Sequence, residues 1–531
     1  MRRWNGWGDD SYTYPVNPSA LAFIEAALGP AVAAARDITL EEAAARVPPS
    51  RLKEHPLITT AATDRLLHCA GQSFPDWVAM RTGTVPSFPD GVAYPVSGED
   101  VKELLNYAKN KGAILIPYGG GTSVVGHLSA PKGDRPVLTV DMGRMNRLIN
   151  LDEKSCLADF QAGVRGPDLE NALRPFGYTL GHYPQSFEYS TLGGWVAARS
   201  AGQFSLGYGK IDSLFTGGTV ETPAGSLILP VIPASAAGPD LRQLILGSEG
   251  RAGIITRAVV RVSPLPEKEC FQAAFFPGPE EGMSAVRQIA RAGIPLCMMR
   301  LSLPEETTTN LALAGHGKAI QLLEKWLSIR GAGEGKCMLL FGAAGSGKKV
   351  HHSLKMAKEI ISQNRGVAVG SRPGKEWLRS RFLVPYLRNN LWEMGYAVDT
   401  LETATTWDKV PSTVQSVDNA LRHGLKEEGE RVHVFTHLSH IYPHGSSIYT
   451  TYLFRLDADP EKNLSRWRSL KGAASRAIVE AGATISHQHG VGTDHLTYLE
   501  SEKGSLGLEV IRSACRSLDP SGIMNTGKMV L

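Results

Sequence analysis

The chain has 531 residues, of which 42% are hydrophobic and 20% are charged, and its formal net charge is +4. This length exceeds what a single core accommodates, so we expect roughly two or three domains. The low net charge argues against a nucleic-acid partner, and six cysteines without a Cys-x-x-Cys pair argue against a disulfide framework or a zinc ribbon. The first residues lack the apolar part of a signal peptide and no run is long enough to span a membrane, so we expect a cytoplasmic protein.

The chain divides into four segments by composition. Residues 1–85 are predicted as an N-terminal helical segment, because residues 21–46 are rich in alanine at helical spacing. Residues 86–266 alternate strand-like and helix-like runs between glycine clusters, which is typical of an α+β nucleotide-binding domain. Residues 267–480 have longer helical segments and fewer glycines, and residues 481–531 contain a histidine-rich stretch and a last helix. We predict that this last segment completes the active site and the domain formed by residues 86–266.

The most informative stretch follows an amphipathic segment and a short apolar run at residues 113–116. It reads Pro-Tyr-Gly-Gly-Gly-Thr-Ser and spans residues 117–123. Adjacent glycines after a strand let the backbone turn with positive φ and approach a ligand closely. Successive main-chain N–H groups can then form an anion-binding nest, and the hydroxyls of Thr122 and Ser123 add donors. A phosphate or pyrophosphate is the expected guest.

Three further glycine-containing motifs follow, at residues 161–169, 185–212 and 246–256. Each alone is a weak signal, but together they resemble the vanillyl-alcohol-oxidase type (PCMH-like) of FAD-binding fold. The resemblance implies an α+β FAD-binding domain over 86–266 and an α/β cap domain over 267–480 that binds substrate. It assigns cofactor binding to Pro117, Tyr118, Gly119, Gly120, Gly121, Thr122, Ser123, Gln185, Ser186, Phe187, Glu188, Tyr189, Ser190, Thr191, Gly193, Gly194, Arg199, Ser200, Ala201, Glu249, Gly250, Gly253, Ile254 and Ile255.

The mode of flavin attachment is predicted from the first of these loops. Family members with covalent flavin place a histidine inside it, where this chain has Gly120 or Gly121, and His127 lies beyond the loop. We therefore expect FAD to be held non-covalently.

A second glycine-rich stretch, at residues 342–349, matches a Walker A loop at all but its last position. That position should offer a serine or threonine to Mg²⁺, and Lys349 cannot. We interpret the stretch as a turn that does not bind ATP.

Histidines gather in two clusters, at residues 437–449 and 485–495. Imidazoles placed together can bind a metal, move protons or hold a phosphate, or they can be satisfied groups of a polar core. We assign no metal site.

The clusters also distinguish subfamilies of the flavin fold. The Asp-Gly-Asn core of the D-2-hydroxyacid dehydrogenases is missing here. The motifs Ser-His-Ile-Tyr at 439–442 and Ile-Tyr at 448–449 instead resemble the alkylglycerone-phosphate synthase family. The resemblance implies an acid/base role for Tyr449 beside His487 and His489, and active-site cations at Arg300 and Arg388. It places Arg388 and His440 among the substrate-binding residues.

One position departs from both subfamilies. Gln488 lies between His487 and His489, where the synthases have histidine and the dehydrogenases have glutamate. Glutamine can orient a ligand but cannot take up a proton near pH 7. This departure leaves open a flavin-binding protein that has lost catalysis.

The function implied by the synthase resemblance is exchange of the acyl group of acyl-dihydroxyacetone phosphate for a fatty alcohol, an ether-lipid reaction in which FAD undergoes no net redox change. The alternative is an FAD-dependent dehydrogenase or oxidase of a D-2-hydroxyacid of the lactate or glycolate type. The expected partner is a small-molecule lipid phosphate. We also allow for peripheral contact with membrane lipid and for a homodimer, and expect no nucleic acid.

Overall fold

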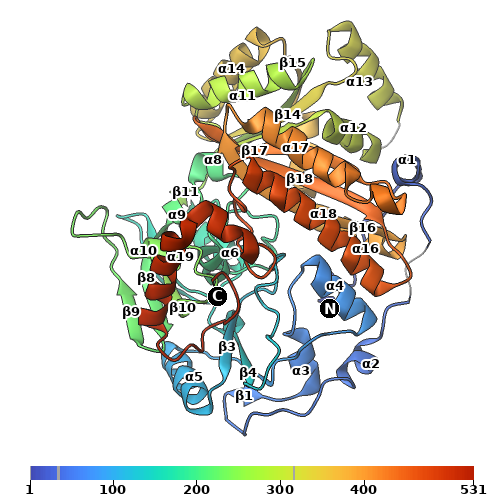
Figure 1. Cartoon of the computed structure of the whole chain (residues 1–531). Coiled ribbons are helices and arrows are strands. Elements are labelled where there is room, and N and C mark those ends of the chain that lie inside the picture. The colour runs from blue at the N-terminus through green and yellow to red at the C-terminus, as the bar shows by residue number, and fades with distance from the viewer. Residues whose placement is uncertain (1, 33–35, 315–316, 531) are drawn as a thin grey trace.

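The computed structural model describes residues 2–32, 36–314 and 317–530 and places their strands in three larger β-sheets and one two-stranded ribbon (Figure 1). The ribbon pairs β7 (Tyr178–Thr179) with β11 (Ser263–Pro264). The first sheet has the order β1 (Ile58–Thr59), β2 (Gly91–Ala93), β4 (Val137–Asp141), β3 (Ile114–Tyr118). Its last three strands are parallel, and helix α5 (Gly98–Lys111) connects β2 to β3. The predicted phosphate loop therefore leaves the carboxyl end of a buried parallel strand.

The second sheet is antiparallel. Together with the first sheet it forms one half of the molecule, the flavin-type half, and the remaining large sheet forms the cap half. Its order is β5 (Leu148–Asp152), β6 (Leu157–Gln161), β10 (Ile254–Arg261), β8 (Phe215–Thr222), β9 (Gly225–Leu229). The helices between these strands are short: α6 (Gly166–Leu173), α7 (Leu192–Ala198), α8 (Ser205–Tyr208), α9 (Ile211–Leu214) and α10 (Arg242–Ile245). The glycine motifs predicted from sequence lie in the connections around α7 and just before β10.

A seven-stranded antiparallel sheet forms the other half. Its order is β15 (Val367–Gly370), β12 (Lys268–Phe276), β14 (Cys337–Gly345), β13 (Met298–Ser302), β17 (His433–Ile441), β18 (Gly445–Arg455), β16 (Tyr396–Thr406). Side chains alternate between the faces of a strand, so each face has its own core. Ala274, Phe276, Leu339 and Phe341 face one cluster, while Phe271 and neighbours of opposite parity face the other.

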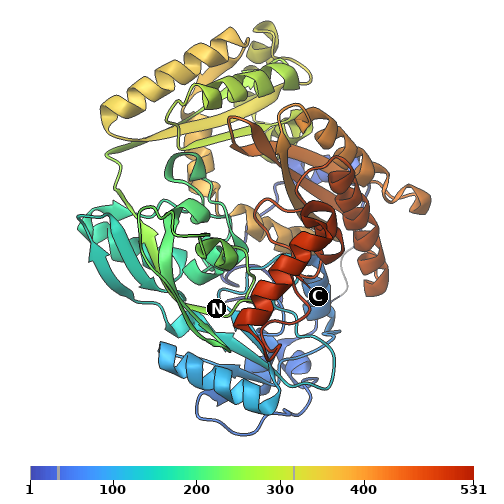
Figure 2. The ribbon, with the colours of Figure 1, turned by 60° about the vertical axis from the view of Figure 1, so that its left-hand side comes forward.

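Helices cover one face of this sheet. Helices α11 (Pro279–Arg291), α14 (Gly347–Gln363) and α17 (Val410–His423) contribute Val286, Val350 and Val410 to the first cluster. Helix α18 (Pro460–Glu480) packs along α17. The second cluster also contains residues of the second sheet, among them Phe160 and Phe215. The opposite face of the large sheet carries α13 (Lys318–Ile329), α15 (Arg372–Ser380) and α16 (Val384–Glu393) and also meets the flavin-type half (Figures 1 and 2).

Together with α12 (Pro304–Leu313), α13, α15 and α16 make four further helices that lie against this sheet. Helix α12 contacts β13, β14 and β17, and α15 lies against β12. Helix α16 lies beside β16.

In its described part, the N-terminal segment contains short separate helices rather than one continuous helix. Described residues in 21–46 contribute to two short helices, α1 (Pro18–Leu28) and α2 (Leu40–Ala44), while residues 33–35 lie outside the described part. Helices α3 (Ala62–Leu67) and α4 (Phe74–Thr82) follow, and β1 joins the first sheet. The ring of Phe74 stacks on Trp467 of α18 at 6.2 Å between centroids. This segment therefore packs against both halves, which alanine spacing alone does not indicate.

The C-terminal helix α19 (Leu499–Leu518) is interrupted at Gly504, whose φ is +67°. It leads from the cap back to the first half, where the N–H of Ala224 donates to the carbonyl of Leu518 (red in Figure 2). The segment after it returns to β3, with Met524 bridged in parallel to Leu115. The last residues thus become part of the first sheet.

The Walker-like stretch is not the turn we predicted. Residues up to Gly345 continue strand β14, Ser346 caps helix α14, and Lys348 and Lys349 lie in the first turn of that helix. A phosphate loop needs several free residues between strand and helix, and here a single residue separates them. Among the described residues, no helix combines the length and apolar character needed to cross a bilayer.

Candidate active site

The predicted phosphate loop packs tightly on the segment before helix α7. A Cβ added to Gly120 would lie 1.8 Å from the carbonyl oxygen of Tyr189, and one added to Gly119 would lie 2.3 Å from Oγ1 of Thr191. Gly121 has φ +65°, which favours glycine. The glycines are therefore required first by the contact between two protein segments. From the sequence alone we expected them for the turn and for the close approach of a ligand.

The other predicted cofactor residues border the same region. Pro117 and Tyr118 end β3, and Thr191 caps helix α7 through its hydroxyl. The positions are as follows: Gln185, Ser186, Phe187, Glu188, Tyr189 and Ser190 precede α7; Gly193 and Gly194 lie in its first turn; Arg199, Ser200 and Ala201 follow it; Glu249, Gly250 and Gly253 precede β10; Ile254 and Ile255 begin that strand.

Three of these side chains contact the cap half. Phe187 stacks on Phe382 with ring centroids 5.2 Å apart, and the amide of Gln185 donates to the carbonyl of Arg381. Tyr189 shares a hydrogen bond of 3.1 Å with Tyr386. The segment between 185 and 191 therefore joins the halves as well as bordering the predicted cofactor site.

A ring of polar contacts ties the first loop to the C-terminal segments. Ser123 Oγ lies 2.9 Å from His127 Nδ1, and His127 Nε2 lies 3.0 Å from Glu249 Oε2. Glu249 accepts the main-chain N–H groups of Val491 and Gly492 at 2.6 and 2.8 Å. Burial would raise the pKa of Glu249, but His127 and these donors lower it overall. This carboxylate holds the histidine-rich loop against the first half.

Backbone strain concentrates around the same ring. Arg199, Glu249 and Asn525 have positive φ values of 53°, 52° and 36°, although none is a glycine. Strain of this kind persists only where the surroundings impose it, and it clusters at ligand sites. The Nδ2 of Asn525 donates to the carbonyl of Glu249 at 2.7 Å, which fixes this turn.

The residues present fit a bound cofactor. Among the described residues, Asn525 Oδ1, His182 Nδ1 and Glu188 Oε2 are buried without a hydrogen-bond partner. Buried polar atoms normally have partners, so a polar ligand between these loops would satisfy them.

Four residues of the large sheet form one row across the face that meets the flavin-type half. Ser302 of β13 pairs with His437 of β17, His437 pairs with Tyr449 of β18, and Tyr449 pairs with Glu402 of β16. Directly paired residues of neighbouring strands lie on the same face. The His437 and Tyr449 rings stack at 4.9 Å between centroids. Register thus brings together residues far apart in the sequence.

A carboxylate outside the sheet holds one end of the row. Glu306 of α12 accepts from Arg300 Nη2 at 2.8 Å and lies 2.8 Å from His437 Nδ1. Burial would raise the pKa of Glu306, but His437 and Arg300 lower it to about 2. Arg300, which the sequence predicts as an active-site cation, is therefore paired with a buried carboxylate.

At the other end, Glu402 organises the histidine loop. Its Oε1 accepts the Ser486 hydroxyl and the N–H groups of Gln488 and His489, all at 2.8 Å. Nδ1 of His487 lies 3.6 Å from Glu402 Oε2, and Nδ1 of His489 lies 3.7 Å from Oε1. Burial would raise the pKa of Glu402, but His489, His487 and the N–H donors lower it overall. Glu402 is thus a charged anchor inside the cluster.

His440 is turned out of its strand by a β-bulge. The register of β17 and β18 shifts between Ser439 and Ile441, and His440 has φ +47°. Its Nδ1 lies 2.8 Å from the Ser205 hydroxyl of the first half, and its ring stacks on His487 at 5.0 Å between centroids. Burial lowers the pKa of His440 well below its usual value and that of His487 to about 4. Both imidazoles are therefore neutral at pH 7.

Of the two histidines expected beside Tyr449, the structure brings His489 to its ring and bonds His487 to a different tyrosine. The hydroxyl of Tyr449 donates to Thr400 Oγ1 at 3.2 Å, and its ring meets His489 edge-on at 5.8 Å. His487 is bonded instead to the hydroxyl of Tyr442, at 2.7 Å. Burial raises the pKa of Tyr449 to about 12. Tyr449 is therefore a neutral phenol at pH 7.

Arg388 lies apart from the row, on helix α16. Its guanidinium covers the ring of Trp77 at 4.0 Å, and Nη1 donates to the carbonyl of Gln72 at 2.7 Å. Nε and Nη2 are buried and have no hydrogen-bond partner among the described residues. Burial lowers the pKa of Arg388 to about 10, so it remains charged at pH 7. Two unpartnered donors on a fixed cation suit an anionic group.

Gln488 contributes its main chain to the cluster. Its N–H donates to Glu402, and its side-chain Oε1 is buried without a partner. Residue 488 therefore keeps its place in the loop without an imidazole.

Sequence reasoning missed Glu306, Thr400, Glu402 and Tyr442 as site residues. Tyr442 lies within the Ser-His-Ile-Tyr motif that carries the synthase resemblance, so that motif was itself a signal. For Glu306 no local signal exists, because only the packing of α12 brings it to His437.

Two family models match successive parts of the chain. Residues 89–229 match the model of an FAD binding domain, and residues 265–529 match the C-terminal domain of FAD linked oxidases. The predicted fold class, an FAD-binding domain with a cap domain, is confirmed.

Individual proteins are similar over most of the chain. The alkyldihydroxyacetonephosphate synthase of Dictyostelium discoideum is 31% identical over 489 residues, which cover 91% of this chain and 79% of the relative. A solved structure of an alkyldihydroxyacetonephosphate synthase superposes with a TM-score of 0.84 at 28% identity, covering 99% of this chain and 98% of the other. The mitochondrial D-lactate dehydrogenase (cytochrome) of Arabidopsis thaliana is more distant, with 25% identity over 84% of this chain and 74% of its own length.

Proposed function

Since the chain belongs to the alkyldihydroxyacetonephosphate synthase family, we propose that it exchanges the acyl group of acyl-dihydroxyacetone phosphate for a fatty alcohol. The protein is an FAD-dependent enzyme, and its cofactor is FAD. In the exchange the bond between a dihydroxyacetone carbon and the ester oxygen breaks, and the acyl group leaves as a carboxylate. The alcohol oxygen then forms the new ether bond to that carbon. The alcohol proton is released, so the reaction balances without an external oxidant or reductant.

This proposal rests on the two guanidinium nitrogens of Arg388 that have no hydrogen-bond partner among the described residues. Its Nε and Nη2 are buried without partners while Nη1 is fixed by Gln72. A buried cation with two open donors is a receptor for an anionic group, and the planar guanidinium can bind two oxygens of a phosphate at once. We assign Arg388 to the substrate phosphate.

The proton transfers fall to the histidine loop and the tyrosine beside it. A proton must be removed from the carbon next to the substrate ketone, and this requires a positioned base. With Nδ1 of His489 facing Glu402, its Nε2 is the atom that can accept a proton. Tyr449, whose pKa burial raises to about 12, then serves as a donor to substrate oxygen. FAD, when bound, supplies an electron-poor ring beside the reacting carbon.

Four further predictions belong to the same proposal: the mode of FAD binding, the place of action, the domain limits and the oligomeric state. The non-covalent mode of FAD binding is supported by the glycines of the first loop. The expected substrates carry long hydrocarbon chains, so we propose that the protein works peripherally at a membrane surface from the cytoplasm. We also propose the domain limits 1–85, 86–266, 267–480 and 481–531, and leave a homodimer as a prediction.

The test is turnover combined with flavin absorbance. Purified holoenzyme is mixed with acyl-dihydroxyacetone phosphate and a long-chain alcohol, and the ether product and the released fatty acid are quantified. We expect equal amounts of both without net bleaching of the flavin. Bleaching by D-lactate or glycolate, without ether formation, would establish the dehydrogenase alternative. Bound FAD with neither reaction would identify a flavin-binding protein without catalysis.

A further inference from the structure

The outer face of helix α13 carries an apolar stripe in the open. Leu322, Trp326 and Ile329 are 67%, 42% and 83% exposed. Their spacing of four and then three residues places them on one face of a helix. The opposite face is already used, because Leu327 is fully buried in the core cluster beneath β14 and Leu323 packs against that cluster. The helix is thus apolar on two sides, and packing explains only one of them.

Basic side chains border the exposed stripe. Lys318 and Lys325 are exposed along one edge, and Arg330 lies at the other edge with its guanidinium 5.9 Å from the Trp326 ring. At about 100° per residue, these cations fall on either side of the stripe.

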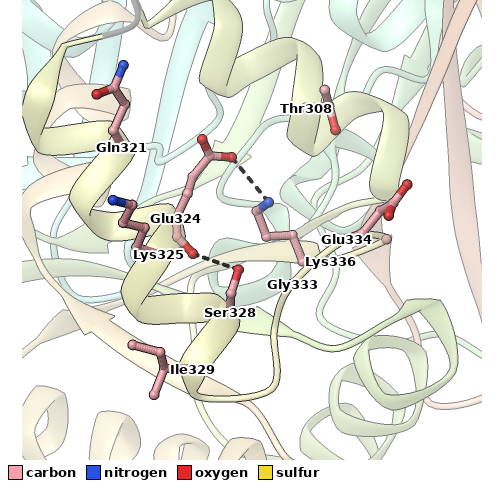
Figure 3. Close-up of a pocket in the computed structure, with 10 residues that line it drawn as sticks. Thr308, Gln321, Glu324, Lys325, Ser328, Ile329, Gly333, Glu334 and Lys336 are labelled. Carbon is pink, nitrogen blue, oxygen red and sulfur yellow. Dashed lines mark hydrogen bonds and ion pairs between the residues drawn. The ribbon is translucent and has the colours of Figure 1, made fainter.

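The acidic residue of this helix is turned away from the stripe. Beside α13 a groove of about 630 Å³ runs toward α12, and its lining includes Glu324 and Lys336. Figure 3 shows the carboxylate of Glu324 directed across this groove to Lys336, whose Nζ lies 3.3 Å away. Ile329 and the exposed Glu334 line the same groove, so one more carboxylate lies near the stripe, but the three cations that border the stripe leave the local charge positive on balance.

We propose that this face of α13 docks the protein on the surface of a membrane that contains anionic lipid. An amphipathic helix with large apolar side chains between lysine and arginine binds the boundary between headgroups and acyl chains. A second copy of the chain fits less well, because stripe-to-stripe packing would bring the cations of both copies together. The preceding helix, α12, carries Glu306 to the active-site row, so this surface is one helix away from the proposed reaction centre.

The inference rests on the proposed function only in that its substrates have long hydrocarbon chains. Its test needs no turnover. Full-length holoenzyme is sedimented with vesicles of phosphatidylcholine alone and with vesicles that also contain phosphatidylserine. We expect binding to the mixed vesicles, weakened by added salt.

Two sets of variants separate the apolar and electrostatic contributions. Replacing Leu322, Trp326 and Ile329 together by serine should weaken vesicle binding by about tenfold or more. Replacing Lys318, Lys325 and Arg330 by glutamine should weaken binding to anionic vesicles by about fivefold per cation at low salt. The matched control is Leu506→Ser with Val510→Ser on α19, which removes side chains that are 78% and 59% exposed on another surface. This control should bind as the unmodified protein does.

Several outcomes would overturn the proposal. It fails if the unmodified protein does not bind either kind of vesicle, or if the control loses binding as much as the α13 variant. It also fails if the α13 variant changes only the sedimentation coefficient of vesicle-free protein, because the stripe would then be an interface between copies. Activity on a short-chain substrate free of micelles should be equal in all variants, so a failed synthase assay and a failed docking assay remain distinguishable.

Discussion

The hydroxyl of Tyr442 and Nε2 of His487 lie 2.7 Å apart, and Nδ1 of the same imidazole lies 3.6 Å from Glu402 Oε2. Because His487 is neutral, it carries one proton, and the neighbouring carboxylate favours that proton on Nδ1. The tyrosine hydroxyl then donates to Nε2. Glu402 and Tyr442 together therefore fix the tautomer and the orientation of His487.

Removing this hydroxyl should disturb the histidine loop without unfolding it. We expect Tyr442→Phe to lower turnover by about tenfold or more, because an unfixed imidazole samples the wrong tautomer and orientation. Ether formation is measured together with the flavin absorption spectrum, which should not change. Tyr178→Phe, at a surface hydroxyl that donates to the carbonyl of Glu153, is the matched control. Full activity of Tyr442→Phe would show that His487 needs no such support.

Tyr449 is the second tyrosine of the site, and its loss should be more costly. Tyr449→Phe removes one oxygen and the bond to Thr400 but keeps the stack on His437. We expect the flavin spectrum to persist and turnover to fall by about 10²–10⁴, the usual effect of losing a positioned acid or base. If this variant retains full activity on whichever substrate the enzyme accepts, the assignment of Tyr449 is wrong.

Residue 488 distinguishes the two reaction types. Its N–H bond to Glu402 comes from the main chain, so substitutions there should leave the loop in place. Gln488→His should preserve or raise ether formation in a synthase, whereas Gln488→Glu should activate oxidation of a hydroxyacid in a dehydrogenase. Both variants are assayed against both substrate classes. Activation of hydroxyacid oxidation by glutamate alone would count against the synthase function.

Flavin retention tests the first loop. Acid precipitation should release the yellow colour into the supernatant, and colour left in the pellet would show a covalent bond. Gly120→Val should abolish flavin retention, because its side chain would overlap the carbonyl of Tyr189 and push the two segments apart. Gly133→Val serves as a comparison in another loop, since a Cβ there meets nothing within 4 Å. Its own φ of +140° adds local strain, so only the comparison of flavin content between the variants is decisive.

Glu306 makes stability depend on pH in a predictable direction. The folded protein lowers the pKa of this carboxyl from 4.5 to about 2. The resulting stabilisation is fully present above the unfolded pKa and is lost as pH falls toward the folded value. Glu306→Gln should therefore destabilise the protein by about 3 kcal/mol near pH 7, because it breaks a buried charge cluster. Urea midpoints of both proteins should converge progressively below pH 4.5, and a constant difference would contradict this account.

Local patterns were sufficient for the flavin-type half. The loop at 117–123 and the glycines before β10 were recognisable because close backbone approach demands particular residues at particular places. The active-site row was not predictable in the same way. Nothing local to Glu402, Tyr449 or His437 encodes which residue faces which, because register is set by the assembled sheet. The Tyr442–His487 bond likewise depends on how two distant segments dock.

The return of the C-terminus to β3 has a consequence for biosynthesis. Nδ2 of Asn525 donates to the carbonyl of Glu249 and its main-chain N–H donates to the carbonyl of Leu115, so the first sheet gains a neighbour from a segment that follows the cap half in the chain. Domains generally fold in order as the chain emerges from the ribosome. In this protein the flavin-type half emerges first, yet β3 receives this neighbour only after the cap half has been made. Completion of the flavin-type half is therefore coupled to synthesis of the cap half.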